Sequence, residues 1–425
     1  MRVLRSGSTG PAVQLLQLAL VRAGYGPLET DGIFGGATRA ALIRFQRQAG
    51  LAADGVAGRE THRALFPWYA GYVTHTVRQG DTLFALAGRY GVPLSSVTAA
   101  NPGVDPAALR PGQTLTVPLP FDVVPTDIAY SSELVAYAVR GLGARYPFIS
   151  VGDIGRSVMG RPLWRMTMGF GENRVLYNAS HHANEWITTP VLLKFAEDLA
   201  KAYVSGGELL GRSAAEIMQY ATLYIVPALD PDGIDLVTGE QSGGSYYEYA
   251  RSIAADYPRF PFPDGWKANI RGVDLNLQYP AGWEQARENK FAAGIVSPAP
   301  ADYVGSAPLT APESRALYDF TLSADPALTL SYHTQGQVIY WRFRDYEPEN
   351  ALAIAQLFST VSGYEVAEVP FESGFAGYKD WFVQDFDRPG YTIEVGLGVN
   401  PLPISDFDGI YRRNLGILTL GALVT

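Results

Sequence analysis

From about Thr126 to the end of the 425-residue chain, short apolar runs typical of strands alternate with longer segments of helical periodicity. Five runs have the length and composition of buried strands: 175–179, 222–226, 328–332, 338–341 and 391–394. Segments 190–203 and 349–360 have the spacing of helices. This alternation predicts an α/β domain with a central, mostly parallel sheet. Residues 240–265, rich in Gly, Tyr, Phe and Pro, are expected to form a long irregular loop that shapes a cleft.

Length and composition limit the remaining possibilities. A chain of 425 residues is expected to form two or three domains, and with no cysteine it contains no disulfide. No stretch is apolar for long enough to predict membrane insertion. Residues 1–7 lead straight into domain-like sequence without the core of a signal peptide, which leaves the location open between the cell wall and the cytoplasm.

The net charge of −9 is unevenly distributed. Residues 1–125 contain 11 Arg, no Lys and 7 acidic groups, a net charge of +4, whereas the other 300 residues carry −13. A mildly basic front end suits an anionic polymer but is too weak to predict binding to nucleic acid.

Candidate metal ligands follow the predicted strands. His182 and Glu185 lie three residues apart, directly after the run 175–179, and His333 ends the run 328–332. Zinc accepts imidazole nitrogen and carboxylate oxygen, and no thiolate is available in this chain. In parallel sheets, functional groups collect at the carboxyl ends of strands, where Glu394 also falls. Three protein ligands with a fourth position left to water would describe a catalytic zinc site.

Four motifs in this order resemble the zinc carboxypeptidases, which are α/β peptidases with a mixed, mostly parallel central sheet flanked by helices. They are His182-Ala183-Asn184-Glu185, Gly272-Val273-Asp274-Leu275-Asn276, the strand-terminal His333, and Tyr391-Thr392-Ile393-Glu394. The resemblance spans essentially the whole segment 126–425.

The resemblance implies a role for each motif residue. His182, Glu185 and His333 would hold one Zn²⁺, with His181 as a neighbour and not a ligand. Glu394 would be the general base that takes a proton from water and passes it to the leaving amine.

Two further roles follow from the same resemblance. Asp274 would orient a ligand histidine, although an ordinary acidic residue at the end of a strand explains it nearly as well. Arg271 would stabilise the tetrahedral oxyanion, and Lys267 lies close enough in sequence to be the alternative.

The substrate-binding positions depart from the exopeptidases of this family. Asn276 is present, but Leu277 replaces the arginine that helps to clamp the terminal carboxylate of the substrate. Glu372 aligns with a mobile tyrosine of the family, and Tyr378 lies nearby. Lys379 occupies the position that sets the character of the specificity pocket, where it would favour an acidic residue; the alternative is a surface lysine in a loop.

Two modules precede the catalytic segment. Residues 1–68 carry two helical patterns and two similar turns, Asp31-Gly32 and Asp54-Gly55, and resemble the three-helix peptidoglycan-binding module. Residues 72–119 read as a βααβ unit and resemble a LysM domain, a family that binds glycans containing N-acetylglucosamine. A short, stiff, proline-containing linker is expected before the catalytic segment 126–425, so that the modules act as tethers.

These departures and modules together resemble the γ-D-glutamyl-diaminopimelate endopeptidases of the family. The sequence therefore predicts a zinc-dependent endopeptidase whose partners are peptidoglycan glycan chains and stem peptides, and it makes no prediction of the oligomeric state. Two alternatives remain open: a metallocarboxypeptidase that removes C-terminal residues, and a wall-binding protein with an inactive catalytic domain.

Overall fold

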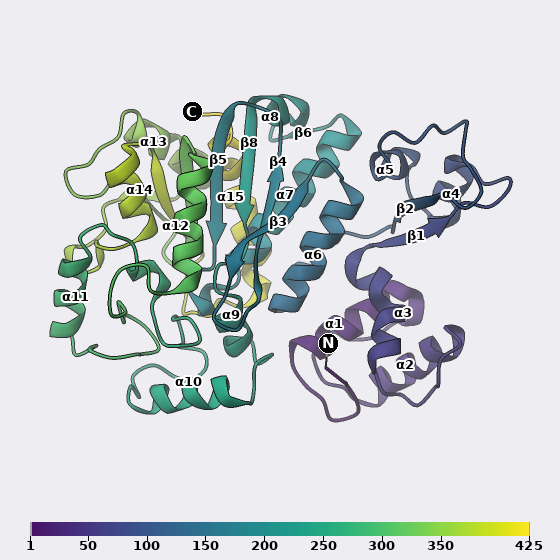
Figure 1. Cartoon of the computed structure of the whole chain (residues 1–425), viewed down its shortest axis with the longest axis horizontal. Helices are drawn as coiled ribbons and strands as arrows, with labels where there is room; N and C mark the ends of the chain where they lie inside the picture. Colours follow the sequence, from purple (N-terminus) through teal and green to yellow (C-terminus); the bar gives the residue numbers. More distant parts are fainter. Residues whose placement is uncertain (1, 425) are drawn as a thin grey trace.

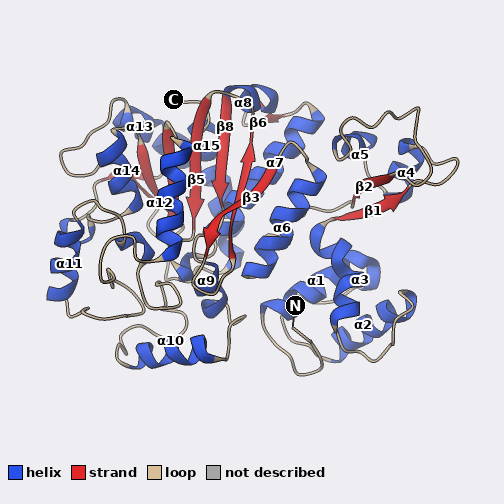
Figure 2. Cartoon of the chain, in the orientation of Figure 1, coloured by secondary structure: helices blue, strands red, loops and turns tan. Residues whose placement is uncertain are grey.

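An eight-stranded mixed sheet forms the centre of the larger part of the chain in the computed structural model, which describes residues 2–424 (Figures 1 and 2). Its strand order is β11-β10-β12-β9-β5-β8-β4-β3. The four central strands, β12, β9, β5 and β8, run parallel to one another, and antiparallel pairs join β10 to β12, β8 to β4 and β4 to β3. The strands are β3 (Ser150–Arg156), β4 (Pro162–Met168), β5 (Asn173–Ala179), β8 (Ala221–Val226), β9 (Leu328–Thr334), β10 (Val338–Tyr340), β11 (Glu365–Ala367) and β12 (Gly390–Val395). The expected α/β fold with a mixed sheet is confirmed, and β3, β4 and β11 are strands of this sheet that the sequence did not predict.

Helices cover both faces of this sheet. Alternate residues of β5 divide between two hydrophobic clusters: Val175 and Tyr177 pack with α7 and α15, whereas Leu176 belongs to the cluster that contains residues of α12 and α14. Every residue of β9 is buried, as expected for a central parallel strand. The helices are α6 (Ser132–Arg145), α7 (Thr188–Ser205), α8 (Ala214–Tyr220), α9 (Pro231–Val237), α10 (Ser245–Ala255), α11 (Trp283–Ala292), α12 (Pro312–Ala324), α13 (Ala351–Ser362), α14 (Tyr378–Phe386) and α15 (Phe407–Gly421).

Shorter elements complete this part of the chain. They are the hairpin β6 (Glu208–Leu209) and β7 (Arg212–Ser213), and the 3-10 helices η2 (Ala183–Glu185), η3 (Leu275–Leu277), η4 (Phe371–Ser373) and η5 (Ile404–Asp406). No helix among residues 2–424 combines the length and the hydropathy that crossing a bilayer requires.

The prediction of an irregular loop over residues 240–265 is wrong in its first half, where α10 forms. Ala250, Ile253 and Ala254 lie on one face of this helix and pack into the main core. Their i, i+3, i+4 spacing is the helical signal, and the surrounding tyrosines and glycines hid it.

The first module contains three helices and a hydrogen-bond network that occurs twice. Gln17, the polar residue on the buried face of the first helix, donates to Asp31 (2.7 Å) and Thr38 (3.1 Å), and its side-chain carbonyl accepts from the Gly32 N–H. Gln46 repeats this pattern with the turn Asp54-Gly55 and with Thr61. The two networks explain the paired Asp-Gly turns, since each turn is held by one buried glutamine. The helices are α1 (Pro11–Leu20), extended by the π-helical turn η1 (Val21–Tyr25), α2 (Gly36–Gln48) and α3 (Arg59–Ala70).

The second module has its own small core. An antiparallel pair of strands, β1 with β2, packs against two short helices, and the Asn101 side chain donates to the carbonyls of Val97 and Thr116, both at 2.7 Å. The elements are β1 (Tyr72–Thr76), α4 (Leu83–Tyr90), α5 (Leu94–Ala99) and β2 (Thr114–Pro118). His75 lies in β1, as expected, and is paired with Asp81 at 2.8 Å.

The first module is docked on the catalytic part and shares a continuous hydrophobic core with it. The segment that follows β2 was expected to be a linker, but Val123 and Val124 are buried. The buried carboxylate of Glu197 in α7 accepts hydrogen bonds from the N–H groups of Val123 (2.6 Å) and Val124 (3.3 Å). Figure 1 shows α6 between the two modules and the sheet. The modules are therefore held against the catalytic part and do not hang from an exposed tether.

A close approach at Gly141 in α6 makes this docking testable. A methyl group at this position would lie 2.2 Å from the Ala70 carbonyl oxygen at the end of α3. Alanine normally stabilises a helix over glycine by up to about 1 kcal/mol. Gly88 in α4 is the control position, since nothing lies within 4 Å of a methyl group added there, and Gly88→Ala should leave Tm unchanged or raise it. Gly141→Ala should instead lower Tm by several degrees and expose residues 119–125 to proteolysis. Equal Tm values for the two variants would contradict the docking.

Candidate active site and metal centre

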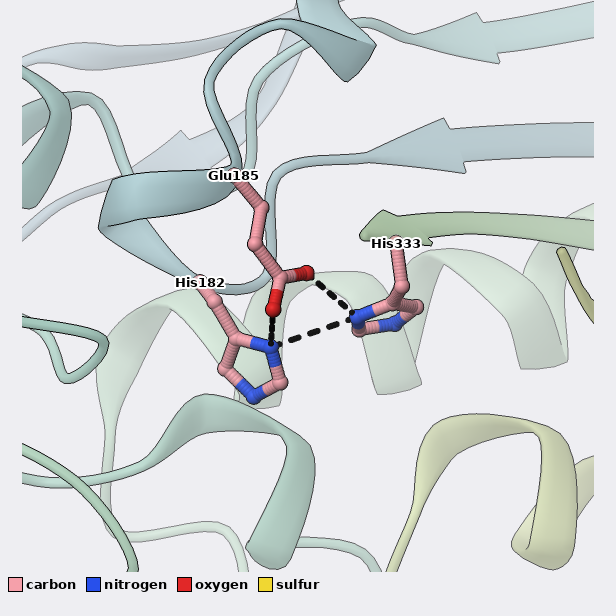
Figure 3. Close-up of side chains that lie close together, drawn as sticks. All are labelled: His182, Glu185 and His333. Carbon is pink, nitrogen blue, oxygen red and sulfur yellow. Dashed lines mark hydrogen bonds and ion pairs between the residues drawn. The ribbon is translucent and has the colours of Figure 1, made fainter. Parts of the chain in front are cut away.

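Two imidazoles and one carboxylate converge at the carboxyl ends of β5 and β9. In the turn after β5, His182 directly precedes η2 and Glu185 is the last residue of η2. His333 lies near the end of β9. Figure 3 shows the Glu185 carboxylate with one oxygen directed at each ring. Nδ1 of His182 lies 3.0 Å from one oxygen, Nδ1 of His333 lies 3.0 Å from the other, and the two nitrogens are 3.2 Å apart. All three side chains are buried, and these are the three predicted metal ligands.

The spacing of these atoms fits a zinc ion. Ligand atoms at about 2.0–2.1 Å from a tetrahedral ion are about 3.3 Å apart, close to the separations in this site. Two ring nitrogens that face each other at 3.2 Å can share only one proton, so at least one of them presents a lone pair. The nitrogen and oxygen donor set is one that zinc accepts.

His182 is oriented by Asp274. Nε2 of His182 lies 3.0 Å from the Asp274 carboxylate, which caps η3 and also accepts from the Asp302 N–H. When Nε2 carries the proton and donates it to Asp274, the lone pair of Nδ1 is free for a metal. Burial lowers the pKa of His182, but the carboxylates of Glu185 and Asp274 outweigh burial and raise it to about 9. A proton and a cation therefore compete for the same nitrogen.

His181 points away from this centre. Its Nε2 lies 3.0 Å from the Tyr279 hydroxyl, and its ring stacks on His333 with 5.4 Å between the centroids. Burial lowers the pKa of His181 well below its ordinary value, so the imidazole stays neutral. The structure thus places it as a packing neighbour of a ligand.

Glu394 lies beside the tripod because of strand register. β12 and β9 pair in parallel with Glu394 opposite His333. Burial and the negative charge of Glu185 raise the pKa of Glu394, although Lys267 and His182 oppose the shift. Burial also disfavours ionisation of Glu185, but His182 and Lys267 outweigh it and hold its pKa well below the ordinary value. The two carboxyl groups therefore differ: Glu185 is a charged ligand, and Glu394 can exchange a proton.

The cation next to the tripod is Lys267, not Arg271. Nζ of Lys267 lies 3.1 Å from Glu185, and the side chain, 34% exposed, reaches the same cleft as Glu394. Arg271 is exposed and does not line this cleft. The geometry therefore favours the alternative that the sequence left open.

A cleft of about 300 Å³ opens above the tripod. Asn276 and Lys379, two of the predicted substrate-binding residues, line it, and so does Leu277. Tyr378 does not: its side chain is fully buried, and its hydroxyl contacts Thr321 at 3.0 Å. The prediction that Tyr378 binds substrate is wrong in this structure, because the first turn of α14 directs the ring into the core. Glu372 in η4 is not among the lining residues.

Lys379 is buried, with 3% of its surface exposed, so it is not a surface lysine in a loop. Nζ donates to the Arg342 carbonyl oxygen at 2.5 Å and pairs with Asp380 at 2.5 Å. The ammonium charge is therefore partly compensated before any substrate arrives.

Thr392 and Tyr340 are among the lining residues that were missed from the sequence. Thr392 lies two residues before Glu394 and so projects from the same face of β12, and Tyr340 comes from the neighbouring β10. The alternation along the strand could have identified Thr392. No local signal identifies Tyr340, since only the pairing of β10 with β12 brings it to the cleft.

Comparisons with known proteins agree with this geometry. Residues 136–400 match the zinc carboxypeptidase family, residues 9–65 match the putative peptidoglycan binding domain, and residues 75–118 match the LysM domain. Gamma-D-glutamyl-L-diamino acid endopeptidase 1 of Lysinibacillus sphaericus is 42% identical over 397 residues, which cover 81% of this chain and 98% of that protein. Protein YqgT of Bacillus subtilis (strain 168) is 39% identical over 293 residues, covering 68% of this chain and 76% of the relative. Bovine thrombin-activatable fibrinolysis inhibitor shares the fold, with a TM-score of 0.53 at 18% identity over 70% of this chain and 97% of its own.

The Asp274–His182 contact predicts the strength of metal binding. Asp274→Ala removes the acceptor that orients the imidazole and should weaken zinc binding by about 10- to 100-fold. Competition with a chromophoric chelator measures this affinity. Asp256→Ala, at an exposed position, is the matched control and should bind zinc like the unmodified protein. Equal zinc affinities for the two variants would contradict the assignment of Asp274.

The converging tripod, the family match over more than half of the chain and the shared fold lead to one conclusion. This chain is a zinc metallopeptidase that belongs to the zinc carboxypeptidase family.

Proposed function

We propose that this protein hydrolyses the peptide stems of peptidoglycan between γ-D-glutamate and the diamino acid. The observation that carries the proposal is the cleft: Leu277 stands beside Asn276 where exopeptidases of the family place the arginine of the carboxylate clamp. An apolar side chain offers no bidentate contact to a terminal carboxylate. The relative that is 42% identical bears the name of a gamma-D-glutamyl-L-diamino acid endopeptidase, and the alignment covers 98% of it.

Charge in the cleft supports a stem peptide as the substrate. Lys267 and Lys379 both line the cleft and give it a positive character, and the diamino acid diaminopimelate carries a carboxylate that an ordinary lysine lacks. Asn276 contributes a second polar group: its side-chain oxygen accepts from the Tyr378 N–H at 2.9 Å, which leaves its amide N–H groups available to a substrate carbonyl.

The residues of the site divide the chemistry between them. When zinc is bound, it supplies Lewis acidity that polarises the scissile carbonyl and acidifies water. Glu394 takes one proton as water attacks the carbonyl carbon, and it delivers that proton to the departing amine. Lys267 places a fixed positive charge where the carbonyl oxygen becomes negative. Asp274 acts through His182 as a positioning residue.

The N-terminal modules suit the same substrate. A peptidoglycan-binding domain and a LysM domain precede the peptidase, and the first is docked against it. We therefore expect the modules to hold glycan strands near the cleft and to raise the local concentration of stem peptides.

Defined muropeptides test the proposed bond. The zinc-loaded protein should release L-alanyl-D-glutamate from L-Ala-γ-D-Glu-diaminopimelate peptides, as measured by mass spectrometry. Glu394→Gln, which removes the proton acceptor, should abolish release while zinc content stays equal. Stepwise loss of C-terminal residues would instead identify a carboxypeptidase, and zinc-loaded protein without any cleavage would identify a binding protein.

Paired substitutions separate the two candidate cations. Lys267→Met should lower kcat by about 10²- to 10³-fold, because it removes one stabilising contact to the oxyanion. Arg271→Met, at an exposed position outside the cleft, is the control and should leave kcat unchanged. Zinc content is measured for both, since Lys267 also contacts the ligand Glu185. A large loss confined to Arg271→Met would reverse the assignment.

A further inference from the structure

A second cavity, of about 450 Å³, adjoins the catalytic cleft. Val369 and Asp380 line both spaces. The cavity lies behind Lys379, whose Nζ donates to the Arg342 carbonyl, and the Arg342 side chain lines the cavity. It therefore extends the specificity side of the cleft and does not form a separate surface pocket.

Most charges in this cavity are already compensated. Arg342 pairs with Glu347 and with Glu368, the latter at 2.6 Å. Asp380 pairs with Lys379. A ligand that engaged these groups would have to break an existing ion pair.

Arg344 is different. Its guanidinium carbon lies 3.9 Å from the centre of the Phe375 ring and 4.3 Å from that of Phe371. Two aromatic rings restrict the orientation of the guanidinium plane without neutralising its charge. Among residues 2–424, no carboxylate forms an ion pair with Arg344. Arg344 is thus a held, unpaired cation that can bind a carboxylate through two parallel N–H groups.

The next residue supplies the opposite charge. Asp345 also lines the cavity, and within the described part of the chain it has no cationic partner. One unpaired cation and one unpaired anion in the same cavity match a group that carries both a carboxylate and an ammonium. The free end of diaminopimelate is such a group, whereas the end of lysine carries the ammonium alone.

We propose that this cavity is the subsite for the free, zwitterionic end of the diamino acid, with Arg344 holding its carboxylate. The inference rests on the proposed function, since it places the leaving diamino acid on the Lys379 side of the cleft. Arg344 then recognises the distal carboxylate of the diamino acid, a different group from the terminal carboxylate that the missing clamp arginine at position 277 would bind.

Kinetics with matched tripeptides test this subsite. The substrates are L-Ala-γ-D-Glu-meso-diaminopimelate, the same peptide with the distal carboxyl amidated, and the lysine analogue. The unmodified enzyme should show a lower KM for the acidic peptide. Arg344→Gln should raise that KM by about 10- to 100-fold while kcat and the KM for the amidated peptide stay unchanged. Arg344→Lys, which keeps the charge, should restore part of the preference.

Arg140→Gln is the matched control. This arginine lies over the Trp164 ring at 5.3 Å, in α6, which packs on β3 and β4 at the opposite end of the sheet from β10. It should keep the preference of the unmodified enzyme. If Arg344→Gln also keeps that preference, with an unchanged Tm, the subsite is refuted.

Two further arms identify the carboxylate and separate this inference from the proposed function. In a tetrapeptide, the other carboxyl of diaminopimelate lies in a peptide bond while the distal carboxyl stays free. If the KM for the tetrapeptide equals the KM for the amidated tripeptide, Arg344 binds the carboxyl that the tetrapeptide lacks, and the proposal is wrong. If the enzyme cleaves none of these peptides, the proposed function fails. Calorimetry of the zinc-loaded protein with free meso-diaminopimelate then still tests the cavity: equal affinities for Arg344→Gln and Arg140→Gln would overturn it.

Discussion

The active site depends on the parallel pairing of β9 between β5 and β12. This pairing places His333 opposite Glu394 and brings the turn that carries His182 and Glu185 to the same edge of the sheet. A shift of one residue in the register of β9 would turn His333 to the other face of the sheet and separate the ligands. The complete burial of β9 makes such a shift unfavourable, because it would also move the apolar residues of the strand out of their packing.

Burial in this region also separates the roles of two similar side chains. Glu185 is surrounded by imidazoles and by Lys267, so its charged form is favoured despite burial. Glu394 is on β12, which β9 separates from β5, and it still lies close enough to that negative charge for its protonated form to be favoured. A divalent cation in the tripod would add positive charge and favour the ionised form of Glu394. The same carboxyl chemistry thus serves as a ligand in one position and as a proton carrier in the other.

The docked first module and the second cavity illustrate how buried charge is handled in the rest of the molecule. At the module junction, Glu197 is satisfied by backbone N–H groups. Beside the cleft, the buried Lys379 has a carboxylate partner, which reduces the cost of burying it, and the half-buried Arg342 is paired as well. Arg344 has aromatic rings in place of a carboxylate, which preserves its capacity to bind an anion.

The sequence alone determined the fold class, the order of the three parts and the metal ligands, because these depend on local periodicity and on short motifs at strand ends. It left Lys267 and Arg271 undecided, since the two are distinguished only by which side chain reaches the cleft. It misplaced Tyr378, whose neighbour Lys379 reaches the cleft while the tyrosine ring enters the core. It also missed the helix within 240–265, although the spacing of Ala250, Ile253 and Ala254 carries a local signal. The tertiary structure alone decided the docking of the first module and the cavity around Arg344. Each of these depends on contacts between residues far apart in the chain, which no local pattern encodes.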